Sequence, residues 1–335
     1  MTSATMAAFS DEQLRCAANL EPHYENWLDA ARAKAALPYG MRWATRDGKE
    51  YLYEALDRKG NAKSLGRRDE GTEATYRSYV EAKEACEERL ARSRATLAET
   101  CSMYRALRLP QVASKAAAIL READLRRLLG SHLLVVGTNA MPAYALEAGG
   151  AIDAPDQTDD FDMAWTGEAT QASVIWPMLK AVDDTYTVNT EKTFQARNAS
   201  AYEVEFLAAP SRTAGIHRLD QPKPVPLDEQ EWLLPGTRVT RVVVGLDGSP
   251  ARIVAPDPRW FALQKLWMAE QPKRNPLKRP KDAKQGTALL TAVADRMPQY
   301  PLGEEFAASL PGELEPYFEA WRATRDSSLP AEPAW

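Results

Sequence analysis

The chain has 335 residues, of which 44% are hydrophobic, and its formal net charge at pH 7 is −5. This length allows two domains with a sizeable buried core, no apolar run approaches the roughly 18 residues of a membrane span, and the acidic balance confines any nucleic-acid contact to a local patch. Three scattered cysteines exclude a disulfide framework and the N-terminus has no export signal, so we expect a cytoplasmic protein.

The first part of the chain is expected to form a module of its own, over residues 1–110. Its predicted elements are a helix over 1–36, strands over 41–46 and 50–56, and a long charged helix over 72–107. Asp47-Gly48 between the strands is a strong hairpin signal, and a second turn at 57–61 extends the hairpin to a small meander. The long helix carries a broken apolar stripe, and a solvated scaffold helix is its simplest interpretation.

The next part, residues 111–255, alternates strands and helices. Its predicted elements are a helix over 111–130, a strand over 131–137, a short helix over 139–149, a strand over 159–165, a helix over 171–183, strands over 185–198 and 201–210, a short helix over 228–234, and a hairpin over 238–256. The strand over 131–137 is continuously apolar, which is typical of a strand covered on both faces. A helix from Pro258 and a final pair of helices from Lys281 make up a C-terminal region, 256–335.

Acidic residues cluster in the strand over 159–165, whose sequence is DDFDMAW. Side chains alternate faces along a strand, so Asp160 and Asp162 share one face while Phe161 and Met163 point into a core. Asp159 falls on the other phase, at the strand entry, where we expect it to be solvated. The strand therefore presents an acidic edge anchored by apolar residues behind it.

A second strand, with the sequence YEVEFL, repeats this pattern with Glu203 and Glu205 on one face. Side by side, the two strands would bring three carboxylates to one point, and hard oxygen ligands of this kind suit Mg²⁺ or Mn²⁺. Glu205 lies between Val204 and Phe206, whereas Glu203 lies near the strand entry, so Glu205 is the expected third ligand. Acidic strand edges are also common without a metal, and a solvated edge is the alternative.

The order of these motifs resembles a known family. VVGTNA at 135–140, TDDFDMAW at 158–165 and VEFL at 204–207 are similar to the motifs of the DNA polymerase β-like nucleotidyltransferase superfamily. The Gly-Thr variant resembles a bacterial branch that includes nucleotidyltransferase-like proteins and abortive-infection toxins. The resemblance covers about 130–290 and implies an α+β fold: a small mixed sheet with helices on one side, here joined to the N-terminal meander and long helix and to the C-terminal helices.

The resemblance implies a two-metal displacement. Asp160 and Asp162 would bridge two Mg²⁺ (or Mn²⁺) ions, and Glu205 would complete the metal nearer the attacking hydroxyl. Gly137 would allow a close approach of the triphosphate, and the nucleotide would also meet Thr138 and Asn139, which open the following helix. A strand-to-helix turn with a helix cap is the structural alternative for Gly-Thr.

Basic residues are the other expected part of the nucleotide site. The run over 265–284 holds seven basic residues against two acidic ones: Lys265, Lys273, Arg274, Lys278, Arg279, Lys281 and Lys284 against Glu270 and Asp282. Lys265 is the best candidate because it lies in an apolar helix, where a charge needs a partner; Lys281 and Arg197 are further candidates for the phosphates. A solvated loop between helices is the alternative interpretation of the run.

Two departures from the family concern the substrate. About 22 residues separate Gly137 from Asp160, so an extra loop is expected over 149–157, and an arginine that often precedes the Asp motif is absent. Other chemistries find no support, because the sequence contains no P-loop, GxGxxG, HExxH, CxxC or GxSxG pattern.

We therefore expect an enzyme that moves a nucleoside monophosphate from an NTP, ATP among the candidates, to a hydroxyl of RNA, protein or a small molecule. The alternative is a catalytically silent nucleotidyltransferase fold that binds nucleic acid or a partner protein through its N-terminal module. All three carboxylate positions are filled, which favours the enzyme. The acceptor and the oligomeric state stay open.

Overall fold

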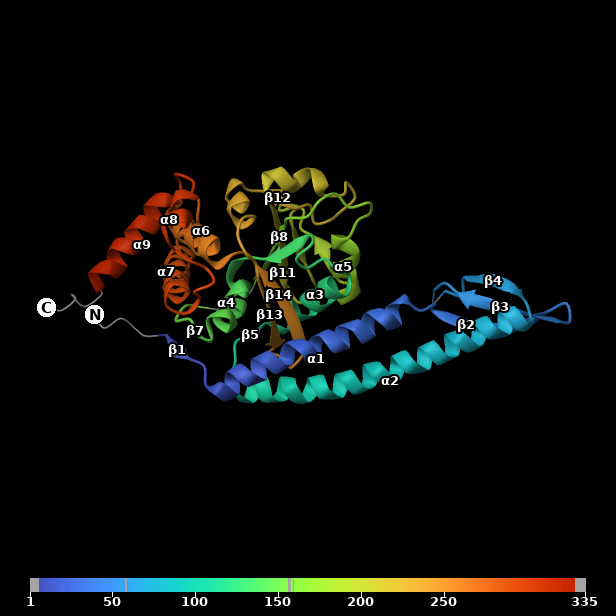
Figure 1. Cartoon of the computed structure of the whole chain (residues 1–335). Coiled ribbons are helices and arrows are strands. Elements are labelled where there is room, and N and C mark those ends of the chain that lie inside the picture. Colours follow the sequence, from blue (N-terminus) through green and yellow to red (C-terminus); the bar gives the residue numbers. More distant parts are fainter. Residues whose placement is uncertain (1–5, 58, 156–157, 159, 329–335) are drawn as a thin grey trace. The chain divides into compact units, whose positions relative to one another are not determined.

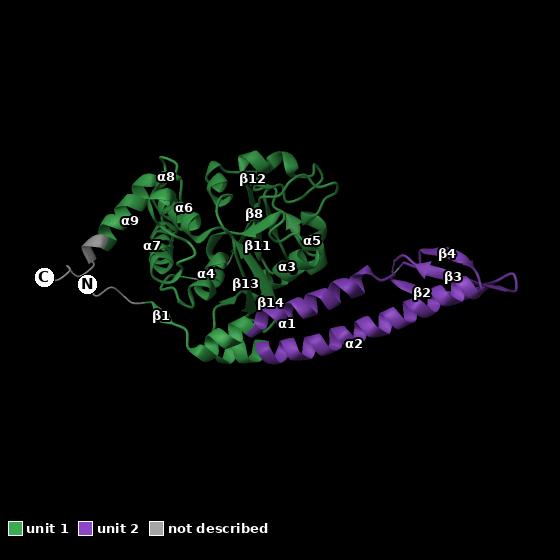
Figure 2. Cartoon of the chain, in the orientation of Figure 1, with its two compact units in different colours: residues 1–18, 101–335 green, residues 19–100 purple. Residues whose placement is uncertain are grey.

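The computed structural model describes residues 6–57, 59–155, 158 and 160–328 (Figure 1). The chain divides into two compact units, one formed by Met1–Ala18 with Cys101–Trp335 and the other by Asn19–Thr100 (Figure 2). Both divisions fall inside helices, α1 (Asp11–Ala36) and α2 (Glu70–Ala106). The domain limits at 110 and 255 stay predictions. The expectation for Asp159 lies outside the described residues.

The unit over Asn19–Thr100 combines a helical hairpin with a three-stranded meander. Its strands, β2 (Gly40–Arg46), β3 (Lys49–Ala55) and β4 (Ala62–Arg67), pair antiparallel in that order. Asp47 and Gly48 connect β2 to β3 with φ angles of +49° and +69°, the positive values that a tight two-residue hairpin turn needs. The predicted meander and its turn are therefore confirmed.

A stripe of buried apolar residues runs along the first helix of this unit. Leu20, Tyr24 and Leu28 of α1 are fully buried, and their spacing of four residues puts them on one stripe. The helices lie side by side in Figure 1, and an ion pair joins Lys34 to Glu87 at 3.3 Å. The helix predicted over 1–36 begins later, at Asp11, while α2 has nearly its predicted limits.

The unit that contains the acidic strands is built around a mixed sheet. Its strands run in the order β6 (Leu133–Val135), β8 (Asp160–Trp165), β11 (Glu203–Ala208), β10 (Gln195–Arg197) and β9 (Thr187–Val188), and β12 (Val225–Pro226) also pairs with β11. The strands β8 and β11 are parallel, and β6 pairs antiparallel with β8. The single strand predicted over 185–198 was wrong, because the chain turns between β9 and β10.

A second sheet and several helices complete this unit. The sheet has the order β14 (Pro250–Ala255), β13 (Val239–Gly245), β5 (Gln111–Val112), and a short pair joins β1 (Ala7–Ala8) to β7 (Gly150–Ala151). The α-helices are α3 (Ser114–Leu125), α4 (Met141–Ala148), α5 (Ile175–Val182), α6 (Pro258–Glu270), α7 (Arg279–Arg296), α8 (Glu304–Ala308) and α9 (Glu315–Ser328). The 3₁₀ helices are η1 (Gly137–Ala140), η2 (Pro210–Gly215) and η3 (Asp228–Leu233).

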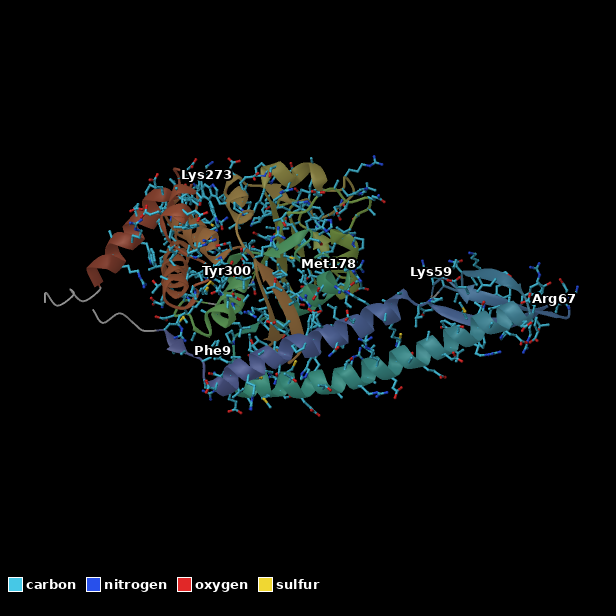
Figure 3. The ribbon with its side chains drawn as sticks, in the orientation of Figure 1. Phe9, Lys59, Arg67, Met178, Lys273 and Tyr300 are labelled. Carbon is cyan, nitrogen blue, oxygen red and sulfur yellow. The ribbon has the colours of Figure 1, made fainter. Side chains whose placement is uncertain are left out.

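The predicted α+β class is confirmed, and the hairpin over 238–256 is present as β13 and β14. Three helices follow α6 where the sequence predicted two, since a short helix forms over Glu304–Ala308. Phe161, Met163, Val204 and Phe206 of the central strands are fully buried, as are Met178 of α5 (labelled in Figure 3) and Leu179. No helix within the described ranges is both long and apolar enough to cross a membrane.

Candidate active site

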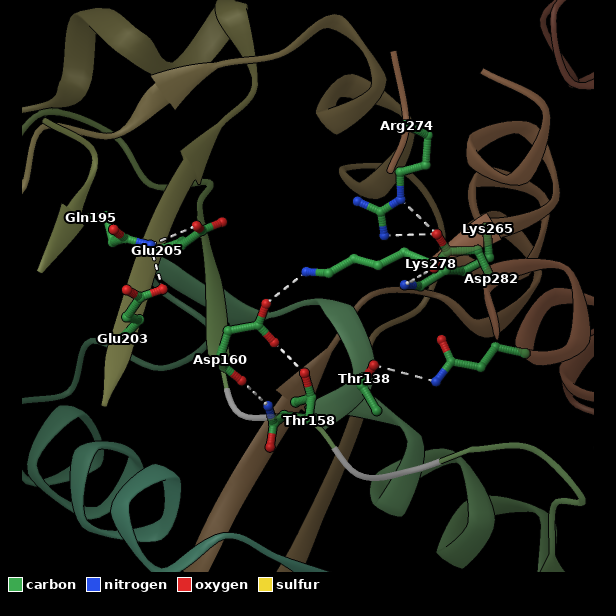
Figure 4. Close-up of polar contacts among 12 residues, drawn as sticks. Thr138, Thr158, Asp160, Gln195, Glu203, Glu205, Lys265, Arg274, Lys278 and Asp282 are labelled. Atoms are coloured by element: carbon green, nitrogen blue, oxygen red, sulfur yellow. Dashed lines mark hydrogen bonds and ion pairs between the residues drawn. The ribbon is translucent and has the colours of Figure 1, made fainter. Parts of the chain in front are cut away.

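The acidic residues of β8 and β11 lie on one face, as the alternation predicts. In the parallel register Asp160 pairs with Glu203 and Asp162 with Glu205. The residues between them point the other way and are fully buried, so the sheet holds the carboxylates on its more open side. Figure 4 shows this face. We call Asp160, Asp162 and Glu205 the carboxylate wall.

Gly137 follows β6 and lies against Asp162 of the carboxylate wall. Its φ is +67°, and a Cβ atom there would lie 2.3 Å from Oδ2 of Asp162, so any other residue would strain the backbone and displace the Asp162 carboxylate. The main-chain N–H of Val136 donates to the Asp162 carbonyl at 3.1 Å and fixes the approach. The close contact that Gly137 permits in this structure is therefore with a carboxylate of the site.

Asp160 is the best-partnered acid of the wall. Lys278 Nζ lies 2.9 Å from Oδ2, the Thr158 hydroxyl donates to the other oxygen, and the Asn139 amide donates to the Asp160 main-chain carbonyl at 3.0 Å. Removal from water raises the pKa of Asp160, but the hydrogen bonds from Thr158 and Lys278 outweigh it and hold the pKa below its usual value. Asp160 therefore stays ionised.

Asp162 is in the opposite situation. Removal from water, followed by repulsion from Asp160 and Glu205, raises its pKa to about 7. Burial also raises the pKa of Glu205, although Gln195 Nε2 donates to this carboxylate at 3.0 Å. Burial therefore makes the ionised form of Asp162 costly, and a bound cation would offset this cost.

Cations face the carboxylate wall across a cavity of about 310 Å³. Lys265, Arg274, Lys278 and Lys281 line its other side, and we call them the cationic wall. They come from α6, from the loop after it and from the first turn of α7. Acids and cations therefore meet at one cavity from separate elements.

One buried carboxylate organises the cationic wall. Asp282 is 1% exposed and lies 2.9 Å from Lys265 Nζ and 2.7 Å from the Arg274 guanidinium (Figure 4). Removal from water raises the pKa of Asp282, but Lys265 and Arg274 outweigh this effect and lower it below its usual value. The partner that a charge in the apolar helix α6 requires is thus Asp282.

The described residues contain no ready-made group of three His, Cys, Asp or Glu side chains that could hold a metal. The reason is visible in the contacts, since Asp160 turns to Lys278 and Glu205 to Gln195. The donor set nevertheless fits a hard divalent cation, because all three groups are carboxylates and they line one cavity.

Seven of the nine predicted site residues line the cavity: Gly137, Thr138, Asp160, Asp162, Glu205, Lys265 and Lys281. Asn139 lies behind it, holding the Asp160 main chain. Arg197 is outside the cavity lining and does not face the predicted phosphate site, because it lies opposite Glu203 in the register of β10 and β11 and forms an ion pair with it.

Sequence reasoning missed Lys278 and Asp282 as parts of the site. Lys278 was counted in the basic run without a role, and only the fold brings it to Asp160, 118 positions away. Asp282 had a usable signal, because a buried lysine needs an acid and this run offers few. Gln195, which donates to both Glu203 and Glu205, had none.

A family model identifies the family of this chain. A family model described as Nucleotidyltransferase matches residues 114–310. The crystal structure of an antigenic nucleotidyltransferase-like protein from Paracoccidioides brasiliensis is similar at 16% sequence identity and a TM-score of 0.38, over 65% of this chain and 92% of that chain. A search of curated proteins returned no match. Because the family match spans more than half of the chain and includes both walls of the cavity, the chain belongs to the nucleotidyltransferase family.

Proposed function

We propose that the cavity binds a nucleoside triphosphate and that the enzyme transfers its nucleoside monophosphate to an acceptor hydroxyl. The observation that carries this proposal is the opposition of the two walls across one cavity, with three carboxylates on β8 and β11 and four cations around α6 and α7. A triphosphate needs cations for its oxygens, and it tolerates neighbouring carboxylates only where a cation lies between them.

The cationic wall orients the phosphates. Arg274 and Lys278 are partly exposed toward the cavity, and Lys281 lines it as well. Asp282 acts as a positioning residue, since it holds Lys265 and Arg274 in one place through two ion pairs. Lys278 has a second task, because a phosphate oxygen that enters the cavity competes with Asp160 for its ammonium group.

The carboxylate wall serves the acceptor side of the reaction. Asp160, Asp162 and Glu205 would hold two divalent ions, Mg²⁺ or Mn²⁺, which when bound neutralise phosphate charge and lower the pKa of the acceptor hydroxyl. Glu205 is the residue placed to take up the hydroxyl proton, because burial raises its pKa and its carboxylate lines the cavity. Glu203 is outside the cavity lining and pairs with Arg197.

The test is a transfer assay with two labels. Each NTP, labelled at the α- or the γ-phosphate, is incubated with the protein, Mg²⁺ or Mn²⁺, and total RNA or lysate. Transfer of a monophosphate breaks the bond between the α-phosphorus and its bridging oxygen, so the α-label joins the acceptor and the γ-label leaves in pyrophosphate. Equal transfer of both labels would indicate another reaction, and neither label moving under any condition would contradict the proposal.

The same assay addresses the finer expectations. Comparing label transfer from the four NTPs tests whether ATP is the donor. Separate reactions with Mg²⁺ and with Mn²⁺ test which ion supports transfer. NTP binding without transfer would favour the alternative of a silent module that binds nucleic acid or protein. Membership of the branch that includes abortive-infection toxins, and a cytoplasmic location, stay predictions.

A further inference from the structure

The meander of the unit over Asn19–Thr100 is basic, although the whole chain is acidic. Residues 39–68 hold eight basic and four acidic residues, a net charge of +4 in a chain of −5. This charge can form a basic surface only if the basic and the acidic side chains lie on different faces of the sheet. The register of β2, β3 and β4 shows on which face each side chain lies.

Residues directly opposite each other in neighbouring strands lie on the same face. Arg42 pairs with Tyr53, Arg46 with Lys49, and Tyr51 with Arg67. The alternation along β3 puts Lys49, Tyr51 and Tyr53 on one side, so all six residues share one face. We call this set the outer face.

The opposite face packs on the helix of the same unit. Leu52 is fully buried, and the Trp43 ring lies 5.8 Å from the ring of Tyr76 in α2. Both acidic residues of the three strands, Glu50 and Glu54, are on this side with Leu52. The strands therefore place no acidic residue on the outer face.

The side chains of the outer face are accessible. Arg42, Lys49 and Arg67 are exposed, and Tyr51 and Tyr53 are half-buried. Arg46 lies 3.9 Å from Asp47 of the turn, but the two side chains are 77% and 92% exposed, so this contact is weak. Arg68 differs, because its guanidinium stacks 5.0 Å from Trp43 and pairs with Glu50 on the other face.

We propose that the outer face binds a single-stranded polynucleotide. Arg42, Lys49 and Arg67 would take successive backbone phosphates, and the two tyrosines, each opposite an arginine, would stack on bases. Exposed cations on a strand face that holds no acidic residue suit a polyanion, and aromatic side chains on a sheet provide a stacking surface that unpaired bases can reach. A duplex buries its base faces, so it would use the cations alone.

The test uses the full chain without NTP and with EDTA, so that it does not depend on transfer. Anisotropy is measured with fluorescein-labelled U12, dT12 and a 12-base-pair duplex. Arg42→Gln with Arg67→Gln should weaken U12 or dT12 binding at least tenfold and reduce the salt slope by about 1.4, or roughly 0.7 per lost phosphate contact. A further probe, dU12, has the bases of U12 and the sugar of dT12, and its comparison with U12 identifies the sugar preference.

The matched control is Lys59→Gln with Lys63→Gln, which removes the same charge from the same meander. Lys59 lies in the turn before β4, and Lys63 lies opposite Glu54 on the helix side. Figure 3 labels Lys59 and Arg67, which flank β4 at its two ends. The control should change the affinity by less than twofold. Equal losses in both double variants would overturn the assignment to the outer face.

A second variant separates stacking from charge. Tyr51→Leu with Tyr53→Leu should weaken single-strand binding by roughly 5-fold or more, the contribution of one stacked base, and leave the salt slope unchanged. Melting curves of every variant check that the unit stays folded. Unaltered affinity in the folded tyrosine variant, tighter binding to the duplex than to either single strand, or no binding of any probe at 100 μM protein in 50 mM salt would overturn the proposal.

Discussion

The β8–β11 pair and the β2–β3–β4 meander sort charge by the same rule but in different surroundings. Alternation along the strands puts Asp160, Asp162 and Glu205 on one face, and it puts Arg42 and Arg67 on one face of the meander. The acids line a cavity and have lost much of their water, whereas the arginines are exposed. Burial therefore decides whether a charged strand face becomes a small-ligand site or a surface for a long polyanion.

The difference in burial changes how strongly the charges of each site interact. Removal from water, followed by repulsion from Asp160 and Glu205, raises the pKa of Asp162 to about 7, and Lys265 and Lys278 each have a defined acidic partner. Exposed charges are screened over about 8–10 Å at physiological salt, so the outer face depends on ionic strength. Salt should therefore affect the two proposed sites very differently.

The largest expected effect is on transfer. Glu205→Gln should lower the transfer rate by about 10²–10⁴-fold, because glutamine cannot take up the proton of the acceptor hydroxyl. NTP binding should stay near normal, because glutamine has the shape of glutamate. Glu203→Gln is the matched control on the same strand face, and we expect a change below about threefold, since Glu203 is engaged with Arg197 outside the cavity.

Single-turnover rates measure both variants. If the two effects come out reversed, the proposed cluster must be redrawn around Glu203.

The next effect is on folding. Asp282→Ala removes the carboxylate between Lys265 and Arg274 and leaves a buried lysine without its acid, a type of change that costs about 3–5 kcal/mol. Urea denaturation gives the change in the free energy of unfolding. Asp153→Ala removes the acid of the exposed Lys284 pair and should leave the midpoint unchanged. An unchanged free energy of unfolding in Asp282→Ala would contradict the role given to Asp282.

A smaller effect is expected on nucleotide binding. Lys265→Ala should weaken NTP binding by about tenfold, because it removes one cation of the wall and loosens the Arg274 contact through Asp282, and 1.4 kcal/mol corresponds to this factor. Lys273 and Lys284 are outside the cavity lining, so replacing either with alanine should leave the Kd unchanged. Isothermal titration calorimetry with the tightest NTP compares the three variants, and equal Kd values would contradict the role of Lys265 in nucleotide binding.

The smallest effect is a pH-dependent gain in stability. The folded protein binds a proton at Asp162 more tightly than the unfolded chain does, so stability falls as pH rises from about 4 to about 7. Asp162→Asn removes this penalty. In EDTA we expect its Tm to exceed that of the parent by roughly 2–4 °C at pH 8, and the difference to vanish near pH 4. A Tm gain that is independent of pH would show that the Asp162 charge is not its cause.

Some features could be predicted because they depend on neighbours in the chain. Alternation along a strand settles which residues share a face, so the acids of β8 and β11 and their apolar backing follow from the order of residues alone. Asp47-Gly48 likewise specifies its turn, because few residues adopt the positive φ values that it needs. The family motifs also depend on such local order.

Contacts between distant segments were decided only by the tertiary structure. Asp282 joins Lys265 because α7 packs on α6, and Lys278 reaches Asp160 because the loop before α7 lines the same cavity as β8. No local pattern encodes which lysine of a basic run will face inward. Arg197 shows the converse, since it pairs with Glu203, its neighbour across the ladder, and is not part of the cavity lining. The sequence by itself determined the face of each charge, and packing decided its partner, because charge–charge energies depend on distance and burial and not on separation along the chain.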